Sequence, residues 1–336
     1  MEAVAAKWTK LTASERLRRS SQVLSIVEDT VCIFGGELFP RKPIDNQIDL
    51  FHFTENSITE TKAYASAPSP RVGSACTALN GKVYLFSGRG GIDMTPIEEE
   101  GALWVFDSST SSWSTMSPSS TSQPCPAARS YHCLANDGND IIYLHAGCPA
   151  TGRLSDLWSF TISSQTWTEL ASAPDPPRGG TSITYTGVNL YRMNGFDGTK
   201  EQGGSLDIYD PSSNTWSTQT YLPNGTSGPE PRSVSALLSL KIGGEPSLVT
   251  LFGERDPSSL GHQGAGKMLA DVWVYSLRAQ TWSKTNVSGD ADGLPDARGW
   301  FAADVATRAT GTESILIHGG LGESNERLGD IWLLSF

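Results

Sequence analysis

The chain has 336 residues and a formal net charge of -11, with 36 Asp and Glu residues against 25 Lys and Arg residues. The basic residues are spread evenly, so they cannot assemble a basic face for a nucleic acid or an anionic membrane, and both partners are excluded. No stretch approaches the ~18 apolar residues of a membrane-spanning helix, and no signal-peptide pattern opens the sequence. These features predict a cytoplasmic protein.

The cysteines show no CxxC spacing, and their number is odd: Cys32, Cys76, Cys125, Cys133 and Cys148. In a chain of this size an odd set without metal-site spacing indicates reduced thiols. We therefore expect five free cysteines, which agrees with a cytoplasmic location.

The first predicted strand is Trp8–Leu11, and it has no partner nearby in the sequence. The last predicted strand, Ile331–Phe336, lacks the Trp-containing partner that similar strands elsewhere in the chain have. We expect the two to pair, because such a pairing removes a free sheet edge and holds both termini. Residues 13–17 between the first strand and the next element are expected to form a short helical connector.

A hairpin with a fixed aromatic spacing recurs along the chain. Within residues 154–170, Trp158 and Phe160 share one face of a strand, and Trp167 follows Phe160 by seven residues. The spacing returns in three further segments: Trp104, Phe106 and Trp113; Tyr209 and Trp216; Trp273, Tyr275 and Trp282. A weaker copy with a longer turn keeps three aromatic residues: Phe51, Phe53 and Tyr64.

Six segments also contain a strand that ends in glycine: VCIFGG, VYLFSG, IYLHAG, LYRMNG, VTLFGE and ILIHGG. The copies recur about every 56 residues, close to the period of propeller blades. On these motifs the chain resembles the kelch family of β-propellers over essentially its whole length. The resemblance implies an all-β fold, a single six-bladed kelch β-propeller over residues 1–336 whose last blade is closed by the N-terminal strand. The expected blades cover residues 19–66, 71–116, 129–170, 178–220, 232–285, and 298–336 together with 8–11.

One arginine stands at the start of each predicted blade: Arg19, Arg71, Arg129, Arg178, Arg232 and Arg298. The first strand of each blade is innermost and all six run the same way, so these side chains should converge on one mouth of the central channel. In an otherwise acidic protein they would form a basic ring that binds an anionic ligand. Alternatively, each arginine could pair with a carboxylate of an adjacent loop and tie blade to blade.

The longest loop expected at this mouth is GERDPSSLGHQGAGKMLAD, with four chemically active side chains: Glu254, Asp256, His262 and Lys267. It resembles the loop of the glucosinolate-specifier proteins, kelch propellers that direct the decomposition of an unstable sulfated intermediate. In that family Glu, Asp and His at four-residue spacing bind ferrous iron, which implies an Fe(II) site of Glu254, Asp256 and His262. However, Ser258 occupies the middle position, and a hydroxyl is a poor Fe(II) ligand. The alternative is that no cofactor binds and Glu254 pairs with a mouth arginine.

Two aromatic residues follow mouth arginines: Tyr131 lies two residues after Arg129, and Trp300 two residues after Arg298. Alternation along a strand would place each ring beside its guanidinium, where it could hold the apolar part of a ligand. The specifier proteins also carry an aromatic residue near the arginine of the last blade. Three histidines are instead expected to be packed in the core: His132, His145 and His318.

Two functions could use this mouth. The first is a specifier-like, non-redox rearrangement, elimination or cyclisation of a reactive anionic molecule, with the six arginines and Lys267 binding substrate and Glu254 and His262 as catalytic groups. The second is an adaptor that binds an acidic peptide of a protein partner. We favour the first because the sequence shows no BTB, F-box or other recruitment domain. The charged and ligating side chains of the longest loop argue against a third possibility, a structural role without a ligand. A copper radical oxidase is not expected, because its Tyr, Cys and His set has no counterpart.

Overall fold

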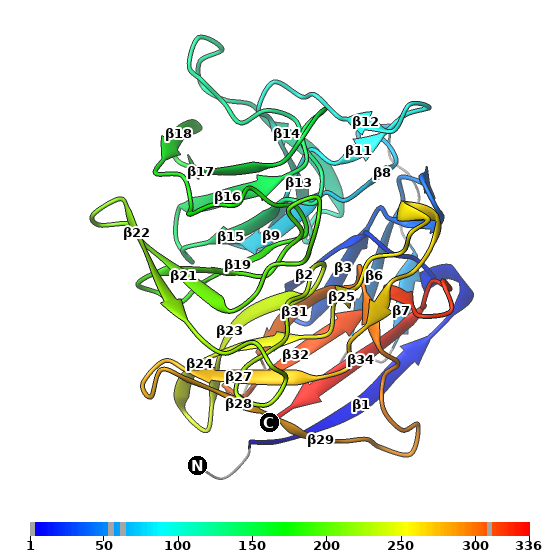
Figure 1. The fold of residues 1–336 in the computed structure, drawn as a ribbon. Coiled ribbons are helices and arrows are strands. Elements are labelled where there is room, and N and C mark those ends of the chain that lie inside the picture. Colours follow the sequence, from blue (N-terminus) through cyan, green and yellow to red (C-terminus); the bar gives the residue numbers. More distant parts are fainter. Residues whose placement is uncertain (1–3, 53–56, 61–64, 308–310) are drawn as a thin grey trace.

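The computed structural model describes residues 4–52, 57–60, 65–307 and 311–336, and its regular structure is almost entirely β-strand (Figure 1). Within these residues the helical structure is limited to two short 3-10 helices, η1 (Glu15–Leu17) and η2 (Gly261–Gln263). The first occupies the connector predicted from the sequence. No helix of the described residues is long and apolar enough to span a membrane.

The described strands form six main sheets of four or five strands, together with four small sheets of two or three strands. Five of the main sheets follow chain order from the inner to the outer strand, and the sixth adds β1 and β29 outside β34. The first three sheets consist of β2 (Val23–Val27), β3 (Thr30–Phe34), β6 (Ile48–His52) and β7 (Ser57–Glu60); β9 (Ala75–Leu79), β10 (Lys82–Phe86), β13 (Leu103–Asp107) and β14 (Ser112–Met116); β15 (Cys133–Asn136), β16 (Ile141–Gly147), β17 (Leu154–Thr161) and β18 (Thr166–Leu170).

The other three sheets have the same plan, and the last includes the N-terminal strand. They consist of β19 (Ser182–Tyr185), β20 (Leu190–Met193), β21 (Ser205–Asp210) and β22 (Thr215–Thr220); β23 (Ala236–Ile242), β24 (Glu245–Leu251), β27 (Val272–Ser276) and β28 (Thr281–Lys284); β31 (Ala302–Thr307), β32 (Glu313–His318), β34 (Asp330–Ser335), β1 (Ala5–Ala13) and β29 (Asn286–Ser288).

The sheets are arranged radially, as in a β-propeller. The inner strands contact one another in chain order, β2 with β9, then β15, β19, β23 and β31, and β31 contacts β2 again. Figure 1 shows these strands in the middle of the molecule, with outer strands such as β18, β22 and β28 at its perimeter. The apolar cores lie between neighbouring sheets; one joins Phe86 of β10 to Phe160 and Trp167 of the next sheet.

The two ends of the chain meet in one sheet, where β1 pairs antiparallel with β34 and Trp8 lies opposite Leu334. Figure 1 shows the blue N-terminal strand beside the red C-terminal one. Trp8 is buried and stacks on Phe252 of the neighbouring sheet, with ring centroids 5.7 Å apart. The pairing predicted from the sequence is therefore present, and β29 adds a further strand on the outer side of β1.

The recurring aromatic spacing is explained by the register of the outer hairpin. Phe160 lies directly opposite Trp167, with ring centroids 4.9 Å apart, and Tyr275 lies opposite Trp282 at 5.0 Å. The seven-residue spacing is therefore the length of the turn that brings the two rings together on one face. In the weaker copy, Phe53 and Tyr64 lie outside the described residues.

Two sets of backbone hydrogen bonds link each sheet to the next. In the first, the N–H of the glycine that ends each second strand donates to the carbonyl of an arginine in the following repeat, at 2.8 to 3.0 Å: Gly36 to Arg71, Gly88 to Arg129, Gly147 to Arg178, Gly195 to Arg232, Gly253 to Arg298, and Gly320 to Arg19. These glycines have φ between +92° and +110°, and a Cβ on any of them would come within 2.9 Å of a neighbouring atom. The recurring Gly motif therefore marks the close contact between sheets.

The second set forms a cycle at the centre, which we call the axial ring. Each N–H donates to the carbonyl of the corresponding residue in the preceding sheet, at 2.7 to 3.1 Å, and all six residues have positive φ: Ser21, Gly73, Tyr131, Gly180, Val234 and Trp300. Each follows, by two residues, one of the six arginines expected at the starts of the blades. The left-handed backbone ends the extended stretch before the inner strand begins, which is why Arg298–Gly299 (β30) is separate from β31.

Candidate functional site

A cavity of about 410 Å³ lies at the end of the axis where the glycine-terminated strands end, and we call it the mouth cavity. Its wall is built on one position of the repeat. The residue that follows the recurring turn glycine lines the cavity in all six repeats: Glu37, Arg89, Cys148, Phe196, Glu254 and Leu321. Each of these residues pairs with the residue next to a repeat arginine, so the fold holds its backbone in a fixed place.

Tyr131, Val234 and Trp300 of the axial ring also line the mouth cavity. The Tyr131 and Trp300 rings meet edge to face with centroids 5.2 Å apart, and a Cβ on Gly73 would lie 2.8 Å from the Tyr131 ring. A second cavity, of about 420 Å³, is lined by the six inner strands, beginning at the residues that follow the axial ring. The aromatic side chains therefore form an apolar floor between the two cavities.

Tyr131 and Trp300 line the mouth cavity, but the expected strand alternation is not what places them there. Strand alternation does not apply to them, because both residues adopt left-handed backbone conformations, with φ of +54° and +60°. The backbone turn directs these rings to the axis while Arg129 and Arg298 remain buried in their own sheets.

The expected open ring of six arginines is also wrong. All six are at most 2 % exposed, and none lines the mouth cavity: Arg19, Arg71, Arg129, Arg178, Arg232 and Arg298. We call them the repeat arginines. The alternative reading holds in part: five of the six pair with a carboxylate, as expected, but partners such as Asp156 for Arg129 belong to the arginine's own repeat and do not tie one blade to the next.

Arg129 shows the arrangement in full. Its Nε donates to the Ala127 carbonyl at 2.8 Å and its Nη1 to the Ala146 carbonyl at 3.1 Å, while both Nη atoms reach Asp156 at 2.7 and 2.8 Å. Trp158 Nε1 donates to the same carboxylate at 2.8 Å. The Asp-x-Trp sequence of this outer strand is therefore the acceptor for the repeat arginine.

The pairing recurs with Asp271 for Arg232 and with Asp330 for Arg298, each of which also accepts a Trp indole N–H. Burial raises the pKa of Asp271, but the Arg232 guanidinium outweighs it and leaves that pKa below its usual value. Such a buried, bidentate pair is costly to break, because one partner would be left charged without compensation.

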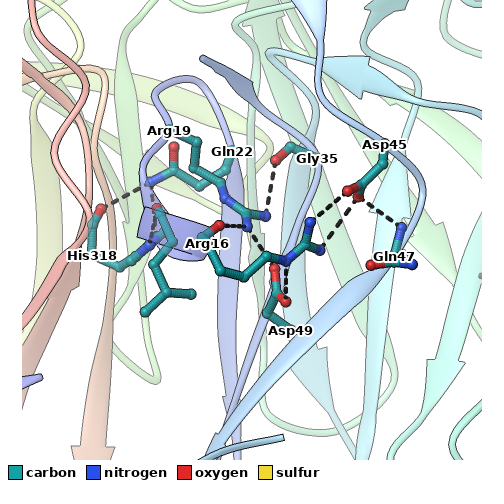
Figure 2. A network of polar contacts seen from close by, with 9 residues as sticks. Arg16, Arg19, Gln22, Gly35, Asp45, Gln47, Asp49 and His318 are labelled. Atoms are coloured by element: carbon teal, nitrogen blue, oxygen red, sulfur yellow. Dashed lines mark hydrogen bonds and ion pairs between the residues drawn. The ribbon is translucent and has the colours of Figure 1, made fainter. Parts of the chain in front are cut away.

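Arg71 and Arg19 use carboxylates from other positions. Arg71 binds Glu99 through both Nη atoms, at 3.0 and 2.8 Å. Figure 2 shows that Arg19 and Arg16 converge on Asp49, with Nη2 of Arg19 at 2.6 Å and Nε of Arg16 at 2.8 Å.

Arg178 is the exception among the repeat arginines. It donates to the Pro176 and Asn194 carbonyls, both at 3.1 Å, but has no carboxylate partner among the described residues. Ser205 occupies the place of the paired aspartate in this sheet, four residues before the aromatic residue of the hairpin. Burial, together with the nearby charge of Arg192, lowers the pKa of Arg178 to about 10.

The cations that do line the mouth cavity come from loops: Arg89, Arg153 and Arg327. Arg327 donates to Glu37 at 3.1 Å and is neutralised by it. Arg89 donates from Nε to Ser130 Oγ at 3.0 Å, and the Arg153 guanidinium lies 5.0 Å from the Phe196 ring centroid. We call Arg89 and Arg153 the loop arginines; within the described part of the chain neither is paired with a carboxylate.

Two carboxyl groups, Glu201 and Glu254, lie on another part of the wall. Burial raises the pKa of Glu254, against the effect of the Gly266 N–H, which donates to Oε1 at 2.7 Å, and of the Trp300 indole. Burial likewise raises the pKa of Glu201, and the negative charges of Glu254 and Asp256 raise it further. Carboxyl groups with a raised pKa are candidates for holding or releasing a proton.

The predicted Fe(II) ligands are not assembled by the residues that the structure describes. Glu254 is buried in the wall, whereas Asp256 is exposed, and the described residues contain no group of three His, Cys, Asp or Glu side chains that could hold a metal. His262 lies in η2, and its side chain is outside the described residues. The described donors alone do not fit a metal centre, and we derive no chemical step through one. Lys267, in β26 (Lys267–Met268), is exposed and does not line the cavity.

The histidines expected to be packed are buried. Nδ1 of His318 accepts from Gln22 Nε2 at 3.2 Å, and its Nε2 donates to the Leu17 carbonyl at 3.0 Å. Burial, together with the charge of Arg19, lowers the pKa of His318 to about 3. His145 contacts the Asp156 carbonyl at 2.7 Å. All five cysteines are free, as predicted. Burial raises the pKa of the Cys148 thiol in the cavity wall, although Arg153 and Arg89 oppose that effect.

Sequence reasoning missed the loop arginines and Glu201. For Arg89 a signal existed, because it directly follows a turn glycine, as Glu254 does. Arg153 and Glu201 stand at no shared position of the repeat, so only the fold shows that they belong to the cavity.

A model of the KLHDC2/KLHL20/DRC7 Kelch-repeats domain matches residues 21–253. The chain is 24% identical over 344 residues to the N-(sulfonatooxy)prop-2-enimidothioate sulfolyase of Thlaspi arvense. The alignment covers 94% of this chain and 92% of that protein. It is 27% identical over 287 residues to an F-box/kelch-repeat protein of Arabidopsis thaliana, covering 80% of this chain and 56% of the relative. A third match, to tip elongation aberrant protein 3 of Schizosaccharomyces pombe, is 28% identical over 172 residues but covers 43% of this chain and 15% of that protein.

Proposed function

The protein belongs to the kelch-repeat family, and from that premise we propose that it binds a small anionic molecule in the mouth cavity and directs its non-redox conversion. In this proposal the six sheets are the blades of one closed domain over residues 1–336, and the cavity at its axis is the site. The conversion is a rearrangement, elimination or cyclisation of a reactive molecule, in the manner of the specifier proteins. The substrate is held by the loop arginines and not by the repeat arginines.

The observation that carries the proposal is the state of Arg89 and Arg153. Both line a cavity with an apolar floor, both act on the pKa of Cys148 between them, and neither has a carboxylate partner in the described structure. Guanidinium groups in such a setting bind oxyanions through charge-assisted hydrogen bonds, each worth about 1.5–3 kcal/mol. The name of the sulfolyase relative describes a substrate with an N-sulfonatooxy group. We propose the same class of oxyanion for this protein.

The other cavity residues have separate roles in this proposal. Tyr131 and Trp300 pack against the apolar part of the substrate. Arg89 and Arg153 stabilise the negative charge that grows on a departing oxyanion, which is the contribution that lowers the barrier. Glu254 and Glu201 hold or accept the proton that the rearranging molecule exchanges.

Binding can be tested by isothermal titration calorimetry with phenylmethanesulfonate, a stable molecule with an oxyanion and an aromatic ring. We expect binding by the unmodified protein and a loss of about 10-fold or more in affinity for Arg89→Ala and for Arg153→Ala. Arg278→Ala is the matched control, because Arg278 is 84 % exposed and lies away from the cavity. Equal affinity in all four proteins, or no binding by any of them, would contradict the proposal.

Conversion can be tested by adding the protein to freshly generated N-(sulfonatooxy)prop-2-enimidothioate and identifying the products by gas chromatography with mass spectrometry. We expect the unmodified protein, but not Arg89→Ala, to change the product ratio relative to spontaneous decomposition. An unchanged ratio together with binding would leave a receptor without this activity.

A second candidate function is an adaptor that captures a peptide at the same mouth. Three loops carry exposed apolar side chains, Phe39 in β4 (Glu37–Phe39), Ile92 after β11 (Arg89–Gly90) and Leu260 before η2, which are 63%, 102% and 70% exposed. Exposed apolar side chains indicate a contact surface where they form one contiguous patch. Replacing all three by Ser should abolish capture of a peptide partner but leave the affinity for phenylmethanesulfonate unchanged.

A further inference from the structure

The charged residues of the mouth cavity are sorted around its wall. Following the cyclic order of the repeats, Arg89 and Arg153 come from the second and third repeats, and Glu201 and Glu254 from the fourth and fifth. The sixth and first repeats contribute Arg327 and Glu37, which neutralise each other at 3.1 Å. After this pair is set aside, one half of the wall is positive and the adjoining half is negative.

The negative half has unused capacity for hydrogen bonds. Glu254 is 6% exposed; its Oε1 accepts the Gly266 N–H, and the Trp300 indole also acts on this carboxyl. Oε1 of Glu201 is buried and has no hydrogen-bond partner, and within the described residues neither carboxyl is paired with a lysine or an arginine. Buried carboxylates without a cationic partner are unfavourable, so a bound donor would stabilise both.

The positive half has the complementary property. Within the described residues, Nε of Arg153 is buried without a hydrogen-bond partner. Between the two halves lies the apolar floor of Tyr131, Val234 and Trp300. The cavity of about 410 Å³ is within the range of small-molecule sites, which is about 300–1,000 Å³.

From this arrangement we infer that the preferred ligand is amphoteric, a small molecule with an oxyanion at one end, an ammonium group at the other and an apolar segment between them. The oxyanion binds Arg89 and Arg153, the ammonium binds Glu201 and Glu254, and the apolar segment lies on the aromatic floor. This inference rests on the proposed function and specifies the substrate class of the same cavity. A simple anion would satisfy the arginines but leave the two carboxyls without a partner.

Three probes of similar size separate the alternatives: 4-(aminomethyl)benzenesulfonate, 4-methylbenzenesulfonate and 4-methylbenzylamine. Calorimetry at pH 7.5 should give the amino sulfonate an affinity at least about 10-fold higher than either other probe, since it makes both charge-assisted contacts. In Glu201→Gln and in Glu254→Gln this advantage should fall to less than about 3-fold, while the affinity for 4-methylbenzenesulfonate stays equal or rises. Glu245→Gln is the matched control, because Glu245 is exposed on the β23–β24 hairpin.

The outcomes distinguish the two proposals. If 4-methylbenzenesulfonate binds as tightly as the amino sulfonate, or if both glutamine variants retain the full advantage, the amphoteric ligand is ruled out and the anion site remains. If no sulfonate binds, the proposed function itself fails. Thermal melting of each variant identifies one that is unfolded, and the other glutamine variant then decides the question, because the two glutamates come from different repeats.

Discussion

Arg129 and Arg89 lie in neighbouring repeats at the same end of the axis, and their surroundings differ in every respect that matters for function. Arg129 is 1% exposed and holds Asp156 through two hydrogen bonds of 2.7 and 2.8 Å. Arg89 is half-buried, is fixed by the Ser130 hydroxyl and lines the mouth cavity. The comparison shows that the arginine that returns in every repeat is buried among fixed acceptors, whereas Arg89, which occurs once at a repeated position, lines the cavity without a carboxylate partner in the described structure.

The reason lies in what each repeat supplies. A repeat arginine meets a carbonyl two residues before it and a carbonyl at the end of the second strand, as Arg232 does with Glu230 and Phe252 at 3.0 Å. These acceptors are backbone atoms, so they recur with the fold whatever the side chains are. The loop position after the turn glycine has no such fixed partners, and its side chain varies from glutamate to arginine, cysteine, phenylalanine and leucine.

The largest expected effect comes from removing a repeat arginine. Arg129→Ala should lower the free energy of unfolding by about 3–5 kcal/mol, because Asp156 would remain buried and charged without its partner. Urea denaturation followed by tryptophan fluorescence measures the change. A loss below about 1 kcal/mol would mean that the pair does not anchor the sheet, and Arg278→Ala serves as the neutral comparison.

The second effect is a pH dependence of protein stability that arises from His318, which lies near the repeat arginine Arg19. His318 has a pKa of about 3 in the folded protein because of burial and the charge of Arg19, whereas an unfolded histidine titrates near 6.5. As the pH falls below about 6.5, the unfolded chain therefore takes up a proton that the folded one does not, and stability is lost.

By pH 5 this loss should amount to about 2 kcal/mol for one histidine. His318→Phe, which introduces the residue that Phe34 and Phe86 provide at this position, should reduce the dependence between pH 7 and 5 by that amount. Denaturation curves at a series of pH values give the slope. Parallel slopes for the two proteins would show that His318 titrates normally.

A smaller effect, of opposite sign, is expected where the repeat arginine lacks its carboxylate. Ser205→Asp places an acidic side chain at the position of Asp156 and should stabilise the protein by about 1 kcal/mol by pairing with Arg178. Ser205→Asn is the control for shape without charge. If the aspartate variant melts no higher than the asparagine variant, the fourth sheet has reorganised around its Arg192–Asp207 pair, which is 2.8 Å long.

The smallest effect on stability is expected for the loop arginines. Arg89→Ala and Arg153→Ala should each change the free energy of unfolding by less than about 0.5 kcal/mol, because neither breaks an ion pair of the described structure. The same urea titration measures it. A loss as large as that for Arg129→Ala would remove the distinction between the two kinds of arginine.

Much of the fold could be predicted from the sequence, because it depends on patterns that repeat. The spacing of Phe160 and Trp167, the glycines at strand ends and the complementary strands at the two ends of the chain all correspond to pairings in the structure. The site was less predictable. Its chemistry depends on residues that break the repeat, such as Arg153 and Glu201, and on whether a carboxylate far away in the sequence neutralises a given arginine.

Asp156 illustrates the second difficulty. Its position two residues before Trp158 is visible in the sequence, and so is the same spacing for Asp271 and Asp330. The sequence does not show that these carboxylates reach the repeat arginines. The contact becomes clear only when the third strand of each sheet is placed beside the second, with both positioned relative to the axis. Left-handed residues are similarly hidden, because nothing in the local sequence marks Tyr131 or Trp300 as having positive φ.

The central claim is that the loop arginines, and not the repeat arginines, form the anion site. An anomalous difference map from a crystal soaked in selenate, recorded at the selenium edge, tests it most directly. The account predicts a selenium peak in the mouth cavity within about 4 Å of the guanidinium groups of Arg89 and Arg153, a distance set by charge-assisted hydrogen bonds. A peak beside Arg129 or another repeat arginine, with none in the cavity, would contradict it.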